Sequence, residues 1–272
     1  MILSIAGSDN SGGAGIQADI KTSALLHQYC ATAVTAVTAQ NACGLLMSQY
    51  VGDEMLRAQL ETILEEMRPE AVKVGMLPCE SAIRIVCECI ERYSLQNVVV
   101  DPVVKATAGG TLADGHDIPK AYIRYLLPCT TLLTPNLDEV ALFFESAMTG
   151  SKPLINMDTA VAESCNLIFE FMSRTGLKNM LIKGGHGEGD QCVDQLYCSD
   201  GKQYAFTGKR VESQHLHGTG CVLSSAIASL LAGGRQMPEA ISEAKRMLTE
   251  AIKKGAAHPV KKDYGPLYLF AD

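Results

Sequence analysis

Short apolar runs alternate along this chain with longer segments of helical periodicity, and this alternation constrains the fold more than any other feature. The runs predict buried strands at residues 2–6, 71–74, 97–100, 131–133 and 180–182. Apolar stripes over residues 54–67 and 82–93 predict helices that cross over the sheet. Strands that alternate with helices in this way are typical of an α/β fold with a mostly parallel sheet.

The C-terminal part of the chain departs from this alternation. Residues 191–207 alternate apolar and polar side chains around Asp200-Gly201, which predicts a hairpin and antiparallel strands at the edge of the sheet. Two helices are then predicted, one from near Gly220 through Leu231 and one from Pro238 to about Gly255. The 272 residues contain no evident linker or repeat, so we expect a single domain over residues 1–272.

Composition excludes several classes of partner. The formal net charge is -7 and the basic residues are scattered, so neither nucleic acid nor an anionic membrane surface is expected to bind. No apolar run approaches the ~18 residues of a membrane span, and the apolar N-terminus lacks a basic segment typical of a secretion signal. Several of the ten cysteines lie inside apolar patterns, which favours core thiols and a reducing, cytoplasmic location over disulfides or zinc.

The first motif, residues 6–19 (AGSDNSGGAGIQAD), leads from a strand through small residues into a helix. Such a turn presents backbone N–H groups to a polar or anionic ligand. Gly13, Gly15 and Ala18 match the dinucleotide-binding GxGxxG/A pattern, which is the oxidoreductase interpretation. That match is weak, because the tight turn and the later ribose-binding acid are both missing. Taken alone, a flexible turn that needs glycine dihedrals explains the motif better than dinucleotide binding does.

The second motif, residues 217–225 (HGTGCVLSS), precedes an apolar helical run. Gly218 and Gly220 flank Thr219, so the amides of Gly218, Gly220 and Cys221 are expected to converge at a helix N-terminus and form an anion hole. A helix start capped by Thr219 is the alternative. In the first turn, Cys221 is expected to have a lowered thiol pKa. The chain has no Walker A loop, so any phosphate must be bound in another way.

Polar residues also follow the predicted strands. Asp101 comes directly after one strand, and Asn136 and Glu139 follow another, one helical turn apart. Their oxygens suit Mg²⁺, and Lys183, which follows a third strand, suits a nucleotide phosphate. Each has a structural alternative: a turn-forming Asp101, a capping box of Asn136 with Glu139, and a solvated Lys183. Their shared position at one edge of the sheet favours a common site.

Other chemistry is poorly supported by the sequence. The histidines His186, His215 and His217 lie among glycines and polar loop residues without a second ligand at helical spacing, which argues against a zinc triad. The Gly-x-Ser-x-Gly pattern of the simplest hydrolases is absent.

Seven sequence blocks together carry a family resemblance: AGSDNSGGAGIQADIKT, TAVTAQN, VGML, DPV, TPNLDE, KGGH and HGTGC. In this order they resemble the hydroxymethylpyrimidine and hydroxymethylpyrimidine phosphate kinases of thiamine biosynthesis, within the ribokinase-like superfamily. The resemblance extends from residue 6 to residue 225. It implies a three-layer α/β/α sandwich without a long lid, a homodimer, ATP and Mg²⁺, and γ-phosphoryl transfer to a hydroxymethyl group or to the phosphate already on it.

The resemblance also implies roles for individual residues. The pyrimidine is expected to contact Asp19, Gln40, Met76, Val103 and Gly7, and Gln40 offers both a donor and an acceptor to an aminopyrimidine edge. The metal is expected at Asp101 and Glu139, and the nucleotide at Lys183, Thr219, Asn136, Glu139 and Lys245. Gly218, Gly220 and Cys221 are expected to surround the transferred phosphoryl group, with Cys221 as the base.

Two departures from the family pattern concern substrate choice. Lys105 places a charge after DPV, and residues 213–216 (SQHL) differ from the usual segment before His217. Some members with the HGTGC motif are pyridoxal kinases, so a pyridoxal substrate is the nearest alternative. More distant alternatives are a dinucleotide-binding oxidoreductase and a nucleotide-binding module without catalytic activity.

Overall fold

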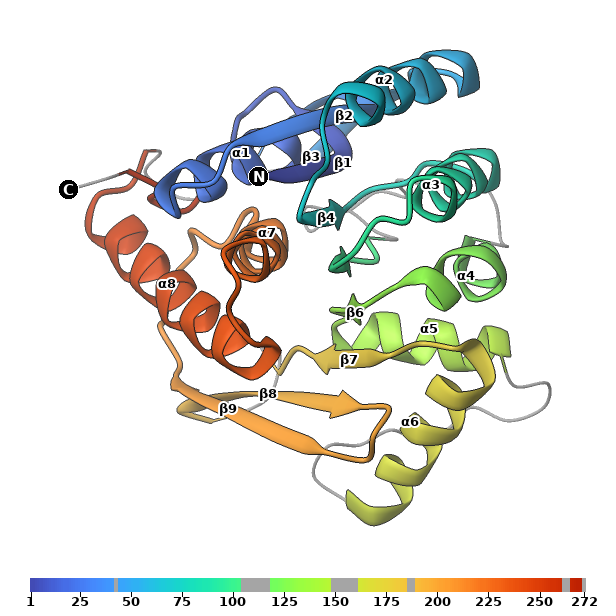
Figure 1. The fold of residues 1–272 in the computed structure, drawn as a ribbon. Helices are drawn as coiled ribbons and strands as arrows, with labels where there is room; N and C mark the ends of the chain where they lie inside the picture. Colours follow the sequence, from blue (N-terminus) through green and yellow to red (C-terminus); the bar gives the residue numbers. More distant parts are fainter. Residues whose placement is uncertain (42–43, 104–117, 148–160, 185–188, 261–264, 271–272) are drawn as a thin grey trace.

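The computed structural model describes residues 1–41, 44–103, 118–147, 161–184, 189–260 and 265–270. The described residues form one nine-stranded sheet in the order β3-β2-β1-β4-β5-β6-β7-β8-β9 (Figure 1). The strands are β1 (Ile2–Asp9), β2 (Cys30–Asn41), β3 (Gly44–Tyr50), β4 (Ala71–Val74), β5 (Val98–Val100), β6 (Leu132–Leu133), β7 (Asn179–Ile182), β8 (Gln191–Cys198) and β9 (Gln203–Lys209). The pairs from β2 through β7 are parallel, and β3, β8 and β9 join by antiparallel pairing.

Helices cover both faces of this sheet (Figure 1). On one face lie α1 (Gly15–Leu25), α7 (Thr219–Ala232) and α8 (Met237–Ala257). On the other lie α2 (Asp53–Glu66), α3 (Glu80–Arg92), α4 (Ile118–Ala121), α5 (Leu137–Ala147) and α6 (Val161–Thr175), with a π-helical turn (Tyr122–Leu126) and a 3-10 turn (Leu127–Cys129) after α4. The predicted three-layer α/β/α arrangement with antiparallel edge strands is confirmed.

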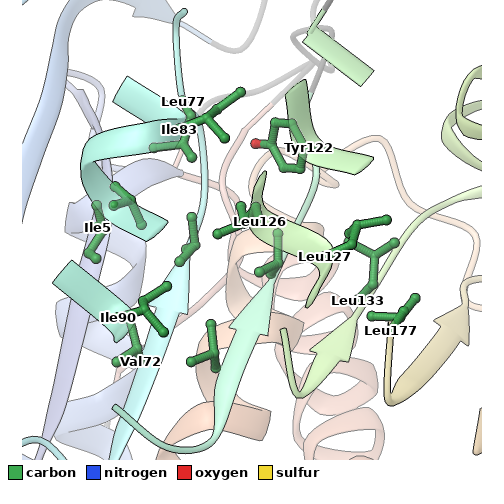
Figure 2. Close-up of a cluster of buried hydrophobic side chains, with 14 of the residues drawn as sticks. Ile5, Val72, Leu77, Ile83, Ile90, Tyr122, Leu126, Leu127, Leu133 and Leu177 are labelled. Carbon is green, nitrogen blue, oxygen red and sulfur yellow. The ribbon is translucent and has the colours of Figure 1, made fainter. Parts of the chain in front are cut away.

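The larger core lies between the sheet and the layer of α2 to α6. Figure 2 shows its centre, where Ile5, Val72 and Leu133 from the strands meet Ile83 and Ile90 of α3. The side chains of α3 that face the sheet recur every three or four residues, which is the stripe expected from the sequence. A second core of apolar side chains joins the opposite face of the sheet to α7 and α8.

Several elements were predicted incompletely. The first strand continues to Asp9, beyond its predicted end at residue 6, because pairing with β2 resumes after an irregularity between Ala6 and Ser8. The sequence pattern did not predict β2, β3, α4, α5 or α6. The predicted hairpin and the two C-terminal helices are present, with small shifts of their ends. Within the described ranges, no helix combines the length and the apolar character that crossing a bilayer requires.

The strand order places a topological switch point at β1. The chain passes from β1 to β2 on one side and later to β4 on the other, so the loops after β1 and β4 diverge. In open α/β sheets, ligands bind beyond the carboxyl ends of the strands at such a point. The residues after β1, β4, β5 and β7 are therefore the first place to look for a site.

Candidate functional site

A cavity of about 820 Å³ opens at this edge of the sheet. Its lining comes from the ends of β1, β2 and β4, from the segments after β5 and β6, and from α7, α8 and the β8–β9 hairpin. The lining includes every site residue predicted from the sequence except Asp19: Gly7, Gln40, Met76, Val103, Asp101, Asn136, Glu139, Lys183, Gly218, Thr219, Gly220, Cys221 and Lys245. Residues far apart in the sequence thus meet in one cavity of a size suited to small ligands.

The glycine-rich turn after β1 is organised by Asp9. Its buried carboxylate accepts hydrogen bonds from the backbone N–H groups of Ser11 and Ala14, each at 2.8 Å. The ring Nε2 of His217 lies 2.8 Å from the same carboxylate. Burial alone would raise the pKa of Asp9, but hydrogen bonds from His217 and Ser11 outweigh it and lower the pKa to about 2. Asp9 therefore joins the two sequence motifs, and its side chain is ionised at physiological pH.

The second motif forms the N-terminus of α7, as predicted. Gly218 precedes the helix with a φ of 89°, in the left-handed region that favours glycine. A Cβ at Gly218 would lie 1.9 Å from the carbonyl oxygen of Gly13, so the two motifs are in backbone contact. A Cβ at Gly220 would lie 3.0 Å from Oδ2 of Asp101. The N–H groups of the first turn of α7 therefore border the cavity, where the helix dipole favours an anion.

The expectation of a lowered pKa for Cys221 is wrong. Burial raises the pKa of this thiol to about 11, and the charges of Asp19 and Asp101 also act to raise it. Lys73 and a hydrogen bond from the backbone of Gly15 act in the opposite direction without compensating. The helix dipole that motivated the expectation is present, but it acts on a group that has lost most of its water. Cys221 is a neutral thiol at physiological pH.

A group of charged residues lies beyond β5, β6 and β7. Nζ of Lys183 lies 2.8 Å from Oδ1 of Asp101 and 4.0 Å from Oε2 of Glu139. Asn136 and Glu139 form a reciprocal capping box, in which each backbone N–H donates to the other side chain at 2.8 Å. Burial and the charge of Asp101 raise the pKa of Glu139 to about 7, although Lys183 opposes the shift. Asn136 and Glu139 therefore form the capping box and also line the cavity, and Lys183 is paired with carboxylates and not solvated.

The far wall of the cavity joins α8 to the hairpin. Nζ of Lys245 lies 2.5 Å from Oδ2 of Asp194 in β8, and both side chains are almost fully buried. Oδ1 of Asp194 accepts a hydrogen bond from the backbone N–H of Gly184 at 2.9 Å. The ion pair thus places a cation beside the segment that follows Lys183.

The opposite end of the cavity is less charged. Met76 is 8% exposed and packs in a small apolar group with Ala36 and the partly buried Val103. A Cβ at Gly7 would lie 3.1 Å from Sδ of Met76, so glycine leaves the space that the methionine fills. Gln40 lies at the end of β2, where its backbone N–H donates to Oδ1 of Asn10 at 2.7 Å. These residues form a wall suited to one flat, partly polar ring.

Asp19 is the one predicted site residue that does not line the cavity. Its side chain is fully buried in α1, and its carboxylate accepts hydrogen bonds from Ser4 at 2.6 Å, from Lys73 at 2.8 Å and from Ser225. All the hydrogen bonds that this carboxylate accepts from these side chains come from other elements of the protein.

Sequence reasoning missed Lys73, which does border the cavity. A signal was present: Lys73 is the only charged residue in β4 (Ala71–Val74), a strand whose residues are all buried. A charged residue in such a strand must be paired, so its position predicts a buried carboxylate partner.

Lys105 and His186 lie outside the described residues.

Comparison with known proteins identifies similar sequences. The family model described as "Phosphomethylpyrimidine kinase" matches residues 9–268. A hydroxymethylpyrimidine/phosphomethylpyrimidine kinase of Rhizobium meliloti is 38% identical over 268 residues, covering 98% of this chain and 96% of the relative. The enzyme of that description from Salmonella typhimurium is 36% identical over 270 residues, with the same coverage.

Solved structures agree in fold. The pyridoxal kinase of Staphylococcus aureus in complex with ADP is similar with a TM-score of 0.82 and 31% identity, covering 98% of this chain and 92% of that one. The phosphomethylpyrimidine kinase of Clostridium difficile has a TM-score of 0.75 and 36% identity, covering 92% of this chain and 98% of that one. The cavity described above thus belongs to a fold that holds a nucleotide in a relative.

Proposed function

This chain belongs to the phosphomethylpyrimidine kinase family and is a phosphotransferase, and on that premise we propose that it phosphorylates 4-amino-5-hydroxymethyl-2-methylpyrimidine and then its monophosphate in thiamine biosynthesis. ATP is the donor, in keeping with relatives that bind ADP and AMP-PCP. The observation that carries the proposal is the two-ended cavity: a flat apolar wall at one end, and lysines with the N-terminal turn of α7 at the other.

The wall of Gly7, Gln40, Met76 and Val103 is the proposed acceptor site. The Gln40 amide has a donor and an acceptor for an aminopyrimidine edge, and the apolar groups of Met76 and Val103 cover the ring. The residues opposite, Lys183, Thr219 and Lys245, with Asn136 of the capping box, are the proposed nucleotide contacts. The phosphate chain of ATP would then extend from the nucleotide end of the cavity toward the acceptor end.

The residues present fit Mg²⁺. Among the described residues there is no group of three His, Cys, Asp or Glu side chains that would enclose a metal. Asp101 and Glu139 do supply two carboxylates at the proposed phosphate end, and Mg²⁺ beside nucleotides is commonly held by one or two carboxylates plus phosphates and waters. When bound, the ion would neutralise charge on the phosphate oxygens.

The first turn of α7 then stabilises the group in transfer. Its backbone N–H groups, with the dipole of α7, face the position where phosphoryl charge must lie. The transition state of phosphoryl transfer is loose and needs little activation of the nucleophile. Only the thiolate form of Cys221 can accept the proton of the acceptor hydroxyl, and with a pKa of about 11 that form is a small fraction of the enzyme at neutral pH. Because the proton leaves late when the transition state is loose, we keep Cys221 as the candidate base in its thiolate form.

ATP consumption with hydroxymethylpyrimidine, its monophosphate and pyridoxal, each as the sole acceptor, tests the proposal. We expect turnover with both pyrimidines, and a loss of at least tenfold in kcat/KM for them in Gln40→Ala. Gln49→Ala on the exposed edge strand β3 is the matched control. Turnover with none of the three acceptors would refute the proposal.

Pyridoxal phosphorylation is the second candidate, because several similar structures are pyridoxal kinases. A pyridoxal ring also carries a hydroxymethyl group and an aromatic nitrogen. Turnover with pyridoxal alone would assign this chain to that activity while leaving the roles of the phosphate end unchanged.

We also propose that two copies associate and that the enzyme works in the cytoplasm. The edge strand β3 leaves one side of its backbone without a neighbouring strand among the described residues, and Leu46 and Met47 on it are 87% and 64% exposed. A second copy would cover these side chains. Nine cysteines among the described residues are free thiols, in keeping with a reducing compartment.

A further inference from the structure

The buried ion pair of Lys73 and Asp19 is the feature that the proposed function leaves without a role. Nζ of Lys73 lies 2.8 Å from Oδ2 of Asp19, and both side chains are 0% exposed. Burial acts to lower the pKa of Lys73, but Asp19 and the other surrounding groups, Asp101 among them, together more than offset it, so the lysine stays charged. Removing two charges from water costs several kcal/mol per ion, and a well-packed apolar pair is often at least as stable. Stability alone therefore does not explain a charge at this place.

The pair sits where four elements meet. Asp19 comes from α1 and Lys73 from β4, while Ser4 of β1 and Ser225 of α7 donate to the same carboxylate. Ser225 is four residues after Cys221 on α7, and Asp19 is four residues after Gly15 on α1. Residues four apart lie on one helix face. The backbone N–H of Gly15 and the Cys221 thiol, which interact, are thus one turn above the pair.

The ammonium lies closer to the cavity than its partner does. A Cβ at Gly75, just after β4, would lie 2.7 Å from Nζ of Lys73, so the side chain extends toward the carboxyl end of the strand. Lys73 borders the cavity and Asp19 does not. An ammonium has three N–H donors, and among the described residues Asp19 accepts one of them. The positive end of the pair is therefore directed to the floor of the site.

We propose that Lys73 is a positioning residue of the phosphoryl-transfer site, whose buried ammonium stabilises negative charge beside the first turn of α7. It acts through its field and not by contact with a ligand. The charged groups that face this place are Lys73 from β4, Asp19 from α1, Asp101 after β5 and Lys183 after β7, and they include two Lys–Asp pairs. Among the groups that lower the pKa of the Cys221 thiol, Lys73 has the largest effect, whereas the charge of Asp19 raises that pKa. Only the predicted effect on kcat depends on the proposed function.

Three variants distinguish the electrostatic effect of Lys73 on catalysis from its contribution to the stability of the fold. Lys73→Met leaves the Asp19 carboxylate buried without its counter-ion, so it is expected to lower stability. The double variant Lys73→Met with Asp19→Asn removes both charges and keeps the shapes; the asparagine oxygen can accept from one serine, and its NH2 group can donate to the hydroxyl oxygen of the other. We expect it to regain much of the lost thermal stability but to keep a kcat at least about tenfold below that of the unchanged enzyme, with the KM for ATP within about twofold. Lys202→Met, on the exposed hairpin turn, is the control for loss of one positive charge.

The rate at which iodoacetamide alkylates Cys221, followed on the peptide that contains it by mass spectrometry, is a readout independent of kinase activity. Because only the thiolate reacts, Lys73→Met is expected to slow alkylation several-fold and Asp19→Asn to accelerate it. General loosening of the site would move both rates in the same direction. A double variant with unchanged kcat, or single variants whose alkylation rates shift together, would overturn the inference. If the unchanged enzyme phosphorylates none of the acceptors, the proposed function fails, and the opposed alkylation rates still decide the inference.

Discussion

Nε2 of His217 lies 2.8 Å from Oδ2 of Asp9, across a sequence separation of 208 residues. The contact joins the glycine-rich turn after β1 to the turn that begins α7. Because Asp9 also accepts from Ser11 and Ala14, the shape of the first turn depends on a residue in the second. The two loops that border the phosphate end of the cavity therefore form together.

Replacing Asp9 by asparagine is expected to destabilise the protein by about 2 kcal/mol at neutral pH, the equivalent of its pKa shift from 3.8 to about 2. The folded protein favours the carboxylate, so the stabilisation is complete above pH 4 and is lost as the pH falls toward 2. Urea unfolding of both proteins at several pH values measures this. Their stability difference should shrink as the solution is acidified, and Glu65→Gln, at an exposed position, should show no such trend. A difference independent of pH would contradict the assignment.

Gly218→Ala and Gly234→Ala form a matched pair. Both glycines have positive φ, 89° and 85°, so alanine is strained by a similar ~1 kcal/mol at each. At Gly234 nothing lies within 4 Å of the added Cβ, whereas at Gly218 the carbonyl of Gly13 lies 1.9 Å away. We expect a fall of a few degrees in Tm at Gly234, and a larger fall with loss of most ATP binding at Gly218. Calorimetry and nucleotide titration measure both, and equal effects would show that the contact between the motifs is unimportant.

Cys221→Ala is expected to lower kcat about 100-fold, at the lower end of what a base contributes, because the thiol is neutral in the resting enzyme. The alkylation rate of the native Cys221 should keep rising with pH toward its pKa of about 11, without a plateau near neutrality. Cys198→Ala, on the hairpin, controls for the loss of a thiol. Near-normal turnover of Cys221→Ala would remove the residue from the reaction.

Lys183→Met is expected to raise the KM for ATP by about 10- to 100-fold, the usual range for one hydrogen bond to a charged group. The substitution also leaves the carboxylates of Asp101 and Glu139 without their shared cation. Lys178→Met, exposed just before the same strand, is the control. An unchanged KM would place the phosphates elsewhere in the cavity.

Leu46→Glu is expected to shift the protein from dimer to monomer, because a charge in an apolar contact is costly to bury. Light scattering coupled to gel filtration gives the mass directly. Met55→Glu, at a position 56% exposed on α2, is the control. A monomer for the unchanged protein would refute the proposed association.

The alternation of apolar runs and helical stripes was sufficient to predict strands β1, β4, β5, β6 and β7 and the covering helices α2 and α3. It missed β2 because its residues, from Cys30 to Asn41, are mostly Ala and Thr, so little hydrophobic contrast marks the strand. Its place beside β1 is set by parallel pairing between residues 28 apart, such as Ile2 and Cys30. A local pattern does not encode such pairing.

The candidate site was predictable where glycines and polar residues follow strands. It was not predictable where burial decides the chemistry. The pKa of Cys221 depends on the water removed around it, and the isolation of Asp19 depends on Ser4, Lys73 and Ser225, which come from three other elements. The position of Cys221 in its motif suggested a lowered thiol pKa, and burial in the folded chain raises that pKa instead.

The acceptor end of the cavity is built entirely from the N-terminal part of the chain. Its wall of Gly7, Gln40, Met76 and Val103 is complete by residue 103, while Lys183, the first turn of α7 and Lys245 all follow residue 180. Chimeras that exchange residues 1–103 between relatives should therefore change which alcohol is chosen, while the nucleotide contacts that follow residue 180 stay the same.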